Sequence, residues 1–364
     1  MERLYDKLKA YSESDFYAFH MPGHKRNKTL LGIELPYDLD ITEIDGFDDL
    51  HHADGILKEE QERAARVFGA EESHFLVNGS TAGILSAVMG CTHRGDKILV
   101  ARHCHKSIYH AIYMNGLVPR YVYPEFDISM HMNGEISKED VAKALAAEPD
   151  IKAVVIVSPN YDGVVSDVKG IAEVAHSYRI PLIVDEAHGP HFGFHPAFPG
   201  RANDLGADVV INSLHKTLPS LTQTAILHIN GKLANRRRIK KYLDMLQSSS
   251  PSYIFMASLD ACVDFLDGKC EEAFELYVER LQKFREELKP LQHLQILRIE
   301  HYDISKVVIS TANANITSPE LADRLRKEYH LEMEMTGGTY VLAMTTVADT
   351  QEGLDRLKSA LLEI

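Results

Sequence analysis

The sequence predicts an α/β protein, in which a mostly parallel sheet forms a large domain and a smaller α+β domain follows it. From residue 75 to about residue 229, short apolar runs alternate with stretches of helical periodicity. This alternation is typical of buried strands that are covered by helices on both faces of a sheet. After residue 229 the pattern changes to long helices, and a compact set of strands and helices follows to residue 364. A chain of 364 residues is long enough for both units.

The chain is expected to begin with an arm, residues 1–60, because Pro, Gly, His and Asp are frequent there and periodicity is weak. A helix is predicted from Gly55 to the residue before Gly69. The large domain is expected to span residues 61–247. Residues 248–364 are expected to form a helical connection and the small C-terminal domain.

Short apolar runs are the strand candidates of the large domain. They lie at 75–77, 97–100, 118–123, 153–157, 182–184, 209–211 and 225–229. Helices are predicted between several of them, at 107–114, 138–148 and 169–178. In the C-terminal part, helices are predicted at 232–247, 258–288 and 319–329, and strands at 306–310, 332–335 and 340–344.

Composition narrows the class of protein. The chain is 45% hydrophobic and 25% charged, as in ordinary globular proteins, and its net charge of −14 argues against binding to a nucleic-acid backbone. Its four cysteines are scattered without paired spacing, which indicates reduced thiols. The N-terminus is polar, and no apolar run approaches the length of a membrane span. We therefore expect a cytoplasmic protein.

Two charged residues that follow predicted strands indicate one kind of chemistry. Lys216 lies in Ser-Leu-His-Lys, directly after the strand at 209–211, and a lysine at this edge of a sheet can hold an aldehyde cofactor as a Schiff base. Asp185 ends the strand at 182–184, and a buried carboxylate there can keep a pyridine nitrogen protonated. Taken alone, the lysine is more often a surface residue, and the aspartate is as readily a cap of the next turn.

Two further motifs lie at predicted junctions between strands and helices. Gly79, Ser80 and Thr81 begin a helix, where backbone N–H groups and hydroxyls can bind a phosphate, although simple helix capping explains them equally well. His105 follows the strand at 97–100, and its ring can stack on a cofactor and handle a proton near neutral pH. All four motifs in this order across one sheet are far less probable by chance than any single one. We therefore predict one site.

The sequence resembles the ornithine/lysine/arginine decarboxylase family of fold-type-I enzymes, which depend on pyridoxal 5'-phosphate (PLP) and share the aspartate-aminotransferase-like fold. The resemblance extends from about residue 16 to the last strand. The motifs that carry it are Phe-His-Met-Pro-Gly-His-Lys at 19–25, Asp-Asp-Leu-His at 48–51, Cys-His-Lys-Ser at 104–107, Asp-Glu-Ala-His-Gly at 185–189, and Ser-Leu-His-Lys at 213–216 with Thr-Gln-Thr at 222–224. The first and the last are rather specific to the family.

The resemblance implies a role for each motif residue. Lys216 would be the Schiff-base lysine, Asp185 the partner of the pyridine nitrogen, His105 the residue stacked on the ring, and Ala187 its neighbour on the opposite face. The other cofactor-binding residues would be Gly79, Ser80, Thr81, His188, Ser213, His215 and Ser249. The loop 248–252, which contains Ser249, would reach a phosphate in the neighbouring subunit, so that the resemblance also implies a homodimer with shared active sites.

Three departures from the family pattern are visible. Pro219 stands where larger members have a small residue, and His188 stands where larger members have Trp, although shorter bacterial members have His. The chain ends at the small domain, whereas many relatives continue into a further domain.

Other functions fit the sequence less well. Asp185–His188 spells a helicase box, but no phosphate-binding Gly-rich loop with Lys-Ser/Thr accompanies it. His103, Cys104 and His105 lack a second ligand pair, so no metal is expected. An aminotransferase commonly has an arginine for the substrate carboxylate on a small-domain strand, and residues 340–344 contain none. A decarboxylase gains from leaving that carboxylate unpaired, which favours decarboxylation.

The predicted reaction is decarboxylation of a basic L-amino acid, with arginine preferred over lysine or ornithine on resemblance to the shorter bacterial members. Another PLP enzyme of this fold, such as an aminotransferase or a different lyase, and a PLP-binding protein without activity remain alternatives. Acidic residues of the arm are candidates to bind the distal cation of the substrate, although such a cluster is more often a solvated turn. They are Glu43, Asp45, Asp48 and Asp49.

Overall fold

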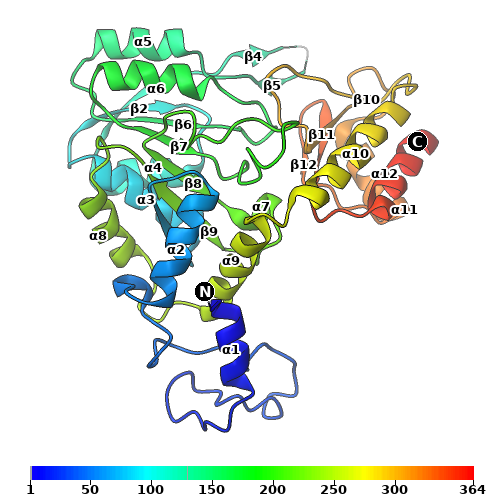
Figure 1. The fold of residues 1–364 in the computed structure, drawn as a ribbon. Coiled ribbons are helices and arrows are strands. Elements are labelled where there is room, and N and C mark those ends of the chain that lie inside the picture. Colours follow the sequence, from blue (N-terminus) through cyan, green and yellow to red (C-terminus); the bar gives the residue numbers. More distant parts are fainter. Residues whose placement is uncertain (1, 129) are drawn as a thin grey trace.

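A computed structural model of the chain describes residues 2–128 and 130–364, and its largest feature is a seven-stranded sheet (Figure 1). The strands from β8 to β3 in this sheet are parallel, and β9 is antiparallel to both of its neighbours. The strand order is β1 (Glu72–Leu76), β9 (Ala225–Ile229), β8 (Val209–Asn212), β7 (Leu182–Asp185), β6 (Val154–Val157), β2 (Lys97–Ala101) and β3 (Val118–Val122).

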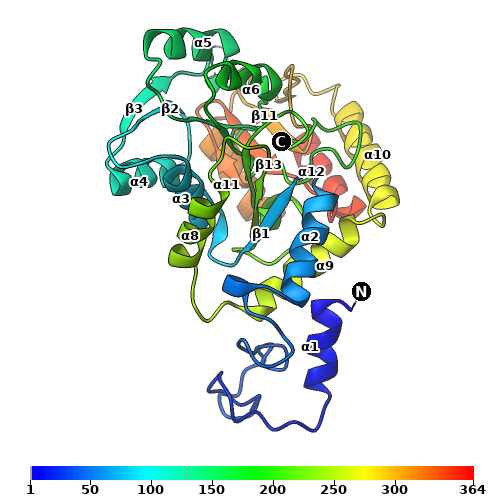
Figure 2. The same cartoon turned by 60° about the vertical axis from the view of Figure 1, so that its left-hand side comes forward.

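Helices cover both faces of this sheet, which explains why its central strands are apolar along their whole length. Every residue of β6, β7 and β8 is buried. Different helices cover the two faces (Figures 1 and 2). They are α5 (Lys138–Ala147) and α6 (Val168–Ser177) on the first face, and α3 (Gly79–Cys91), α4 (Lys106–Asn115) and α8 (Arg236–Leu246) on the second.

A four-stranded antiparallel sheet forms the small domain, with three helices beside it. Its strand order is β10 (Gln295–Ile296), β11 (Lys306–Ser310), β13 (Tyr340–Met344) and β12 (Met335–Thr336). Its helices are α10 (Glu271–Glu287), α11 (Ser318–Tyr329) and α12 (Gln351–Glu363). The strand predicted at 332–335 is shorter than expected and lies at the edge of the sheet. A separate two-stranded ladder is formed by β4 (Phe126–Asp127) and β5 (Met132–Asn133).

The prediction of a single helix at 258–288 is wrong, because the chain forms two helices there. α9 (Tyr253–Leu266) ends before α10 begins, and Gly268 in the short connection has a φ of 75°. Glycine adopts this left-handed conformation without the steric cost that other residues pay. α9 leads from the large domain towards the small domain, so the break redirects the chain between them (Figure 1).

The first residues form an arm that extends away from the body (Figure 2). Its helix α1 (Leu4–Ser12) packs on α9, where Asp260 accepts a hydrogen bond from the backbone of Tyr5 at 3.1 Å. The arm returns through the 3₁₀ turn η1 (Leu50–His52) to α2 (Ile56–Val67), which continues across the boundary predicted at residue 60. None of the helices among the described residues is both long and apolar enough to cross a membrane.

Candidate active site

A cavity of about 360 Å³ lies at the carboxyl-terminal edge of the large sheet. The loops that follow β6, β7 and β8 supply part of its wall, and the start of α3 supplies another part. All but two of the predicted cofactor-binding residues line it, the exceptions being Ser213 and Ser249. The lining residues are Gly79, Ser80, Thr81, Ile84, His103, His105, Val157, Tyr161, Asp185, Ala187, His188, His215 and Lys216.

The sheet brings Asp185 and Lys216 to the same cavity because they follow neighbouring parallel strands. Asp185 ends β7, and Lys216 lies in the short helix α7 (Leu214–Thr217) after β8. The Asp185 carboxylate is buried and accepts a hydrogen bond from the backbone N–H of Ala187 at 3.2 Å. Burial raises the pKa of Asp185, and the nearby Lys216 and the bond from Ala187 oppose this. The carboxylate is therefore prepared for a cationic partner.

The amine of Lys216 is in an environment that favours its neutral form. Burial lowers the pKa of Lys216, while Asp185 and Glu334 oppose the effect. Lys216 Nζ lies 3.0 Å from Nε2 of His188. A neutral lysine amine is a nucleophile, which is what bond formation with an aldehyde requires.

His188 lies between two lysines, and the second of them was not predicted. Its Nδ1 is 3.0 Å from Nζ of Lys306, which is on β11 of the small domain. The ring of Tyr161 meets the imidazole edge-on, with 4.8 Å between the ring centroids. Burial lowers the pKa of His188 well below its usual range, and Lys306 and Lys216 act in the same direction. The imidazole is therefore neutral.

One end of the cavity offers unpaired hydrogen-bond donors that suit an anion. α3 begins there, and the first N–H groups of a helix have no intrahelical partner. The N-cap residue Asn78 makes no side-chain cap hydrogen bond to them, so they can bind a ligand. The hydroxyl of Ser213, which is not part of the cavity wall but precedes α7 directly, is buried and has no hydrogen-bond partner within the described chain. His215 donates from Nδ1 to the carbonyl oxygen of Thr224 at 2.9 Å, and its Nε2 donates as well when the ring is protonated. These groups fit a phosphate.

The predicted residues therefore fit PLP in three separate respects. A lysine with a lowered pKa is suited to the aldehyde, and a buried carboxylate is suited to the pyridine nitrogen. The buried hydroxyl of Ser213 and the uncapped start of α3 are suited to the phosphate.

Hydrogen bonds at the start of α4 fix the ring of His105 at the cavity wall. It is the N-cap residue of α4, and its Nδ1 lies 2.8 Å from the hydroxyl of Ser107. Burial lowers the pKa of His105, and Lys216 adds to the effect. The imidazole thus faces the cavity in its neutral form near neutral pH.

Ser249 lies outside the cavity wall, in the exposed loop between α8 and α9. The preceding Ser248 accepts a hydrogen bond at 2.8 Å from Nε2 of His51 and donates its N–H to Asn78 at 3.4 Å. Ser252 caps α9 by accepting from Phe255 at 3.3 Å. The loop therefore adjoins the start of α3 in its own chain, and its contact with a neighbouring subunit stays a prediction.

The acidic cluster of the arm forms a structural turn. The carboxylate of Asp48 accepts hydrogen bonds from the N–H groups of Asp49, Asp54, Gly55 and Leu57, at 2.8–3.1 Å. These bonds outweigh the effect of burial and lower the pKa of Asp48. None of the four predicted acids lines the cavity. This agrees with the interpretation of the cluster as a turn.

Sequence reasoning assigned no role in the site to four polar residues at or beside the cavity, which are His103, Tyr161, Lys306 and Glu334. His103 lines it and has a buried, unpartnered Nδ1, and burial lowers its pKa to about 4. Tyr161 lines it and donates its hydroxyl to the carboxylate of Glu334, which precedes β12. Lys306 reaches His188 from β11. Tyr161 and His103 had a usable signal, because each lies in a loop that directly follows a predicted strand, as Asp185 and Lys216 do.

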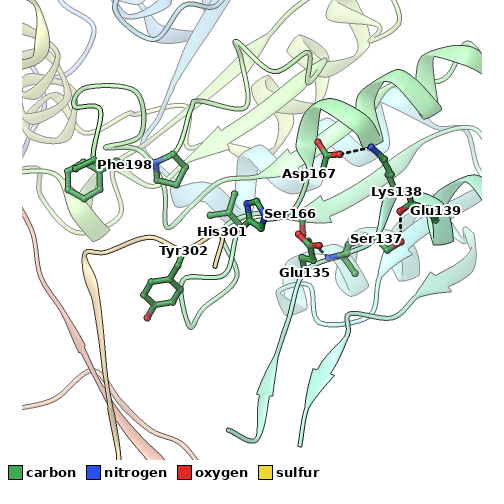
Figure 3. Close-up of a pocket in the computed structure, with 13 residues that line it drawn as sticks. Glu135, Ser137, Lys138, Glu139, Ser166, Asp167, Phe198, His301 and Tyr302 are labelled. Carbon is green, nitrogen blue, oxygen red and sulfur yellow. Dashed lines mark hydrogen bonds and ion pairs between the residues drawn. The ribbon is translucent and has the colours of Figure 1, made fainter. Parts of the chain in front are cut away.

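A second cavity, of about 630 Å³, is larger but has different chemistry (Figure 3). Two pairs of polar side chains in its wall bind one another: Lys138 pairs with Asp167 at 3.3 Å, and Ser137 donates to Glu139 at 3.0 Å. It lies between the start of α5 and the loops at Asp167, Phe198 and 301–302. It offers no amine or imidazole beside a buried carboxylate, so the smaller cavity is the candidate active site.

The sequence matches a known family over most of its length. The model of the family described as "Orn/Lys/Arg decarboxylase, major domain" matches residues 3–312. An arginine decarboxylase of Bacillus subtilis is 35% identical over 376 residues, which covers 99% of this chain and 76% of that protein.

Solved structures agree with the fold. A lysine decarboxylase of Francisella novicida, LdcF, superimposes with a TM-score of 0.85 at 21% identity, and the match covers 99% of this chain. This chain spans 59% of the length of that enzyme. A structure of SPT with PLP superimposes with a TM-score of 0.64 at 16% identity, over 84% of this chain and 76% of that one. These matches confirm the predicted fold class.

Proposed function

Because the chain belongs to the Orn/Lys/Arg decarboxylase family, we propose that it decarboxylates a basic L-amino acid with the help of PLP, and that arginine is the preferred substrate. Membership confirms the predicted family and the enzyme class of amino-acid decarboxylase. The observation that carries the proposal is the meeting of Lys216 and the buried Asp185 in one cavity, beside a group of unpaired phosphate donors.

The residues would hold the cofactor at three points. The amine of Lys216 would bind the aldehyde carbon, Asp185 the pyridine nitrogen, and the start of α3 with Ser213 the phosphate. When bound, PLP supplies an electron sink for the electron pair that remains on Cα after carbon dioxide leaves. Asp185 keeps the nitrogen of that sink protonated, because a carboxylate beside a ring N–H favours the charged form of the ring.

The site leaves the departing carboxylate without a strong ionic partner. β13 carries no arginine, and Lys306 is separated from the cavity wall by His188. A carboxylate that loses its charge in the transition state reacts faster where no cation stabilises the ground state. Lys216 or His105 then supplies the proton to Cα, since both line the cavity.

Arginine as the substrate is supported by the curated relative from Bacillus subtilis, which is named an arginine decarboxylase. Glu334 offers a carboxylate on the small-domain side, where it affects the pKa of Lys216 and is bound by Tyr161. A guanidinium can bind a carboxylate through two parallel hydrogen bonds, which a lysine ammonium cannot do. We propose Glu334 as the partner of the distal cation.

A product assay tests the proposed function. Purified protein with added PLP is incubated separately with L-arginine, L-lysine and L-ornithine, and the amine and the carbon dioxide formed are measured. The highest kcat/KM is expected for arginine. Release of an α-keto acid in place of carbon dioxide would identify an aminotransferase. Bound cofactor without turnover of any of the three would contradict the proposal and favour a binding protein without activity.

We also propose a cytoplasmic homodimer. The arm exposes a row of large apolar side chains, including Phe19 at 90% and Leu30 at 76% exposure, which is unusual for a surface that stays in water. A second copy of the chain is the proposed cover. All four cysteines are free thiols, as is usual in the cytoplasm. Sedimentation equilibrium should give twice the chain mass, and Phe19→Asp with Leu30→Asp should reduce it towards the monomer.

A further inference from the structure

Lys306 is a fully buried lysine whose side chain ends beside the active site. Its stem packs against Gly163, where a Cβ would lie 2.7 Å from Cγ of Lys306. Its Nζ is 3.0 Å from Nδ1 of His188. The neighbouring acid Asp303 is bound elsewhere, to His191 at 3.1 Å and to the hydroxyl of Ser305 at 2.7 Å. The amine is therefore aimed at His188.

The hydrogen-bonding rules for these groups restrict where a proton can lie. An ammonium group only donates, whereas a neutral amine can also accept, and a neutral imidazole has one donor and one acceptor. His188 is neutral and has a lysine amine at 3.0 Å from each ring nitrogen. One amine can donate to the acceptor nitrogen of the ring. The other must accept from the ring N–H, so it must be neutral.

We propose that Lys306 is a positioning residue of the active site, which acts through His188 to hold the amine of Lys216 neutral. With the proton on Lys306, the ammonium donates to Nδ1 of His188, and the hydrogen of the imidazole is on Nε2, directed at Lys216. The neutral amine has the lone pair that bonds to an aldehyde. This inference rests on the proposed role of Lys216 as the cofactor lysine.

Three acids raise the pKa of Lys306, whereas two raise the pKa of Lys216. Burial lowers the pKa of Lys306 to about 8, and Asp303, Glu334 and Asp162 oppose it while Lys216 adds to it. The pKa of Asp303 is lowered despite complete burial, mainly by His191, so Lys306 has an ionised acid beside it. The titratable and charged groups that act on Lys306 or adjoin it are Asp162, Tyr161, His188, Tyr302, Asp303, Glu334 and Lys216.

The test measures the titration of Lys216 in the protein without added cofactor. The protein is acetylated with trace acetic anhydride from pH 6 to pH 11, and the labelling of Lys216 is followed by peptide mass spectrometry. Lys306→Met removes the second amine and should raise the pKa of Lys216 by about one unit, since a positive neighbour is lost. Lys306→Arg keeps the charge and the donor, and should leave that pKa low. The exposed Lys283→Met, on α10, is the control.

Three outcomes overturn the proposal. They are an unchanged titration of Lys216 in Lys306→Met, a raised titration in a folded Lys306→Arg, and a Lys216 in the native protein that titrates near the ordinary value of about 10.4. The titration of Lys216 in the native protein needs no variant, so it tests the proposal even if a substitution of Lys306 prevents folding. Visible absorption after addition of PLP is recorded separately. Absence of a band would overturn the proposed function, while the acetylation result still decides the role of Lys306.

Discussion

Lys216 and Asp185 lie close enough for each side chain to shift the pKa of the other. The lysine lowers the pKa of the carboxyl, the carboxyl raises the pKa of the lysine, and burial acts in the opposite sense on both. Their strands, β7 and β8, are parallel neighbours, which places both residues at one edge of the sheet. The pair is thus prepared for a ligand that bonds to the amine and brings a positive charge to the carboxylate.

Lys216→Ala should abolish the visible absorption band that appears when the native protein is mixed with PLP. The reason is that no other lysine lines the cavity within the described chain. Borohydride reduction followed by peptide mapping identifies the modified residue in the native protein. A stable label on a different lysine would remove Lys216 from its proposed role.

Asp185→Asn should still bind cofactor but lose turnover by about 100-fold or more, equivalent to ~2.7 kcal/mol of transition-state stabilisation. A neutral amide cannot keep a pyridine nitrogen protonated. The matched control is Glu186→Gln, because the adjacent Glu186 is equally buried and is bound to Ala202 and Asn212 outside the cavity wall. Turnover of Asp185→Asn equal to that of the control would contradict the assignment.

Ser213→Ala should weaken PLP binding by about 5- to 150-fold, because a hydrogen bond to a charged group contributes ~1–3 kcal/mol. The hydroxyl is buried without a partner, so its removal costs the folded protein little. Thermal unfolding of the variant without cofactor should match that of the native protein, whereas the dissociation constant from absorption titration should rise. Equal affinities would show that Ser213 does not contact the phosphate.

Ser249→Ala tests whether the loop completes a site in the partner subunit. The alternative is that the loop only links α8 to α9, in which case the serine contributes almost nothing to cofactor binding. If the loop bonds to the partner's phosphate, Ser249→Ala weakens PLP binding, and mixing it with Lys216→Ala restores activity, because one site in each mixed dimer is intact. Activity that only dilutes on mixing, from a fully active Ser249→Ala parent, would show that each chain works alone.

The sequence predicted the large sheet and most of the cavity because both depend on local patterns. Buried strands are continuous apolar runs, and a residue that directly follows such a run lies at the sheet edge whatever the rest of the fold does. Asp185, Lys216 and His105 were found in this way, and all three line the cavity.

Lys306 and Glu334 could not be found by the same reasoning. Lys306 begins β11 in the small domain, directly before the apolar residues 307–309. Nothing near it in the sequence indicates that its side chain reaches His188. Glu334 lies before the short edge strand β12, so its role depends on how the two domains pack. Similarly, the helical periodicity continues from α9 into α10, and the two helices are separated by the short connection 267–270, in which Gly268 has a left-handed conformation.

Glu186 should make the protein less stable as the pH rises above about 4.3, the ordinary value for a glutamate. The side chain is fully buried, and burial raises its pKa to about 8 even though Asn212 and Ala202 donate to it at 3.0 Å and 2.8 Å. A pKa that is raised in the folded state means that folding favours the protonated form. The stability it contributes is complete below the unfolded pKa and is lost as the pH rises through about 8.

Glu186→Gln removes this titration. The stability of the variant relative to the native protein should therefore increase as the pH is raised from 5 to 9. The glutamine oxygen can still accept from Ala202, but the new amide meets the amide nitrogen of Asn212, so the substitution carries a cost that does not depend on pH. Any fixed cost of the substitution cancels when the two pH values are compared. The difference in Tm between variant and native protein should change by roughly 2–4 °C for each ~1 kcal/mol of linkage. The exposed Glu173→Gln, on α6, serves as the control, and a difference that is the same at both pH values would show that Glu186 is ionised in the folded protein throughout the range.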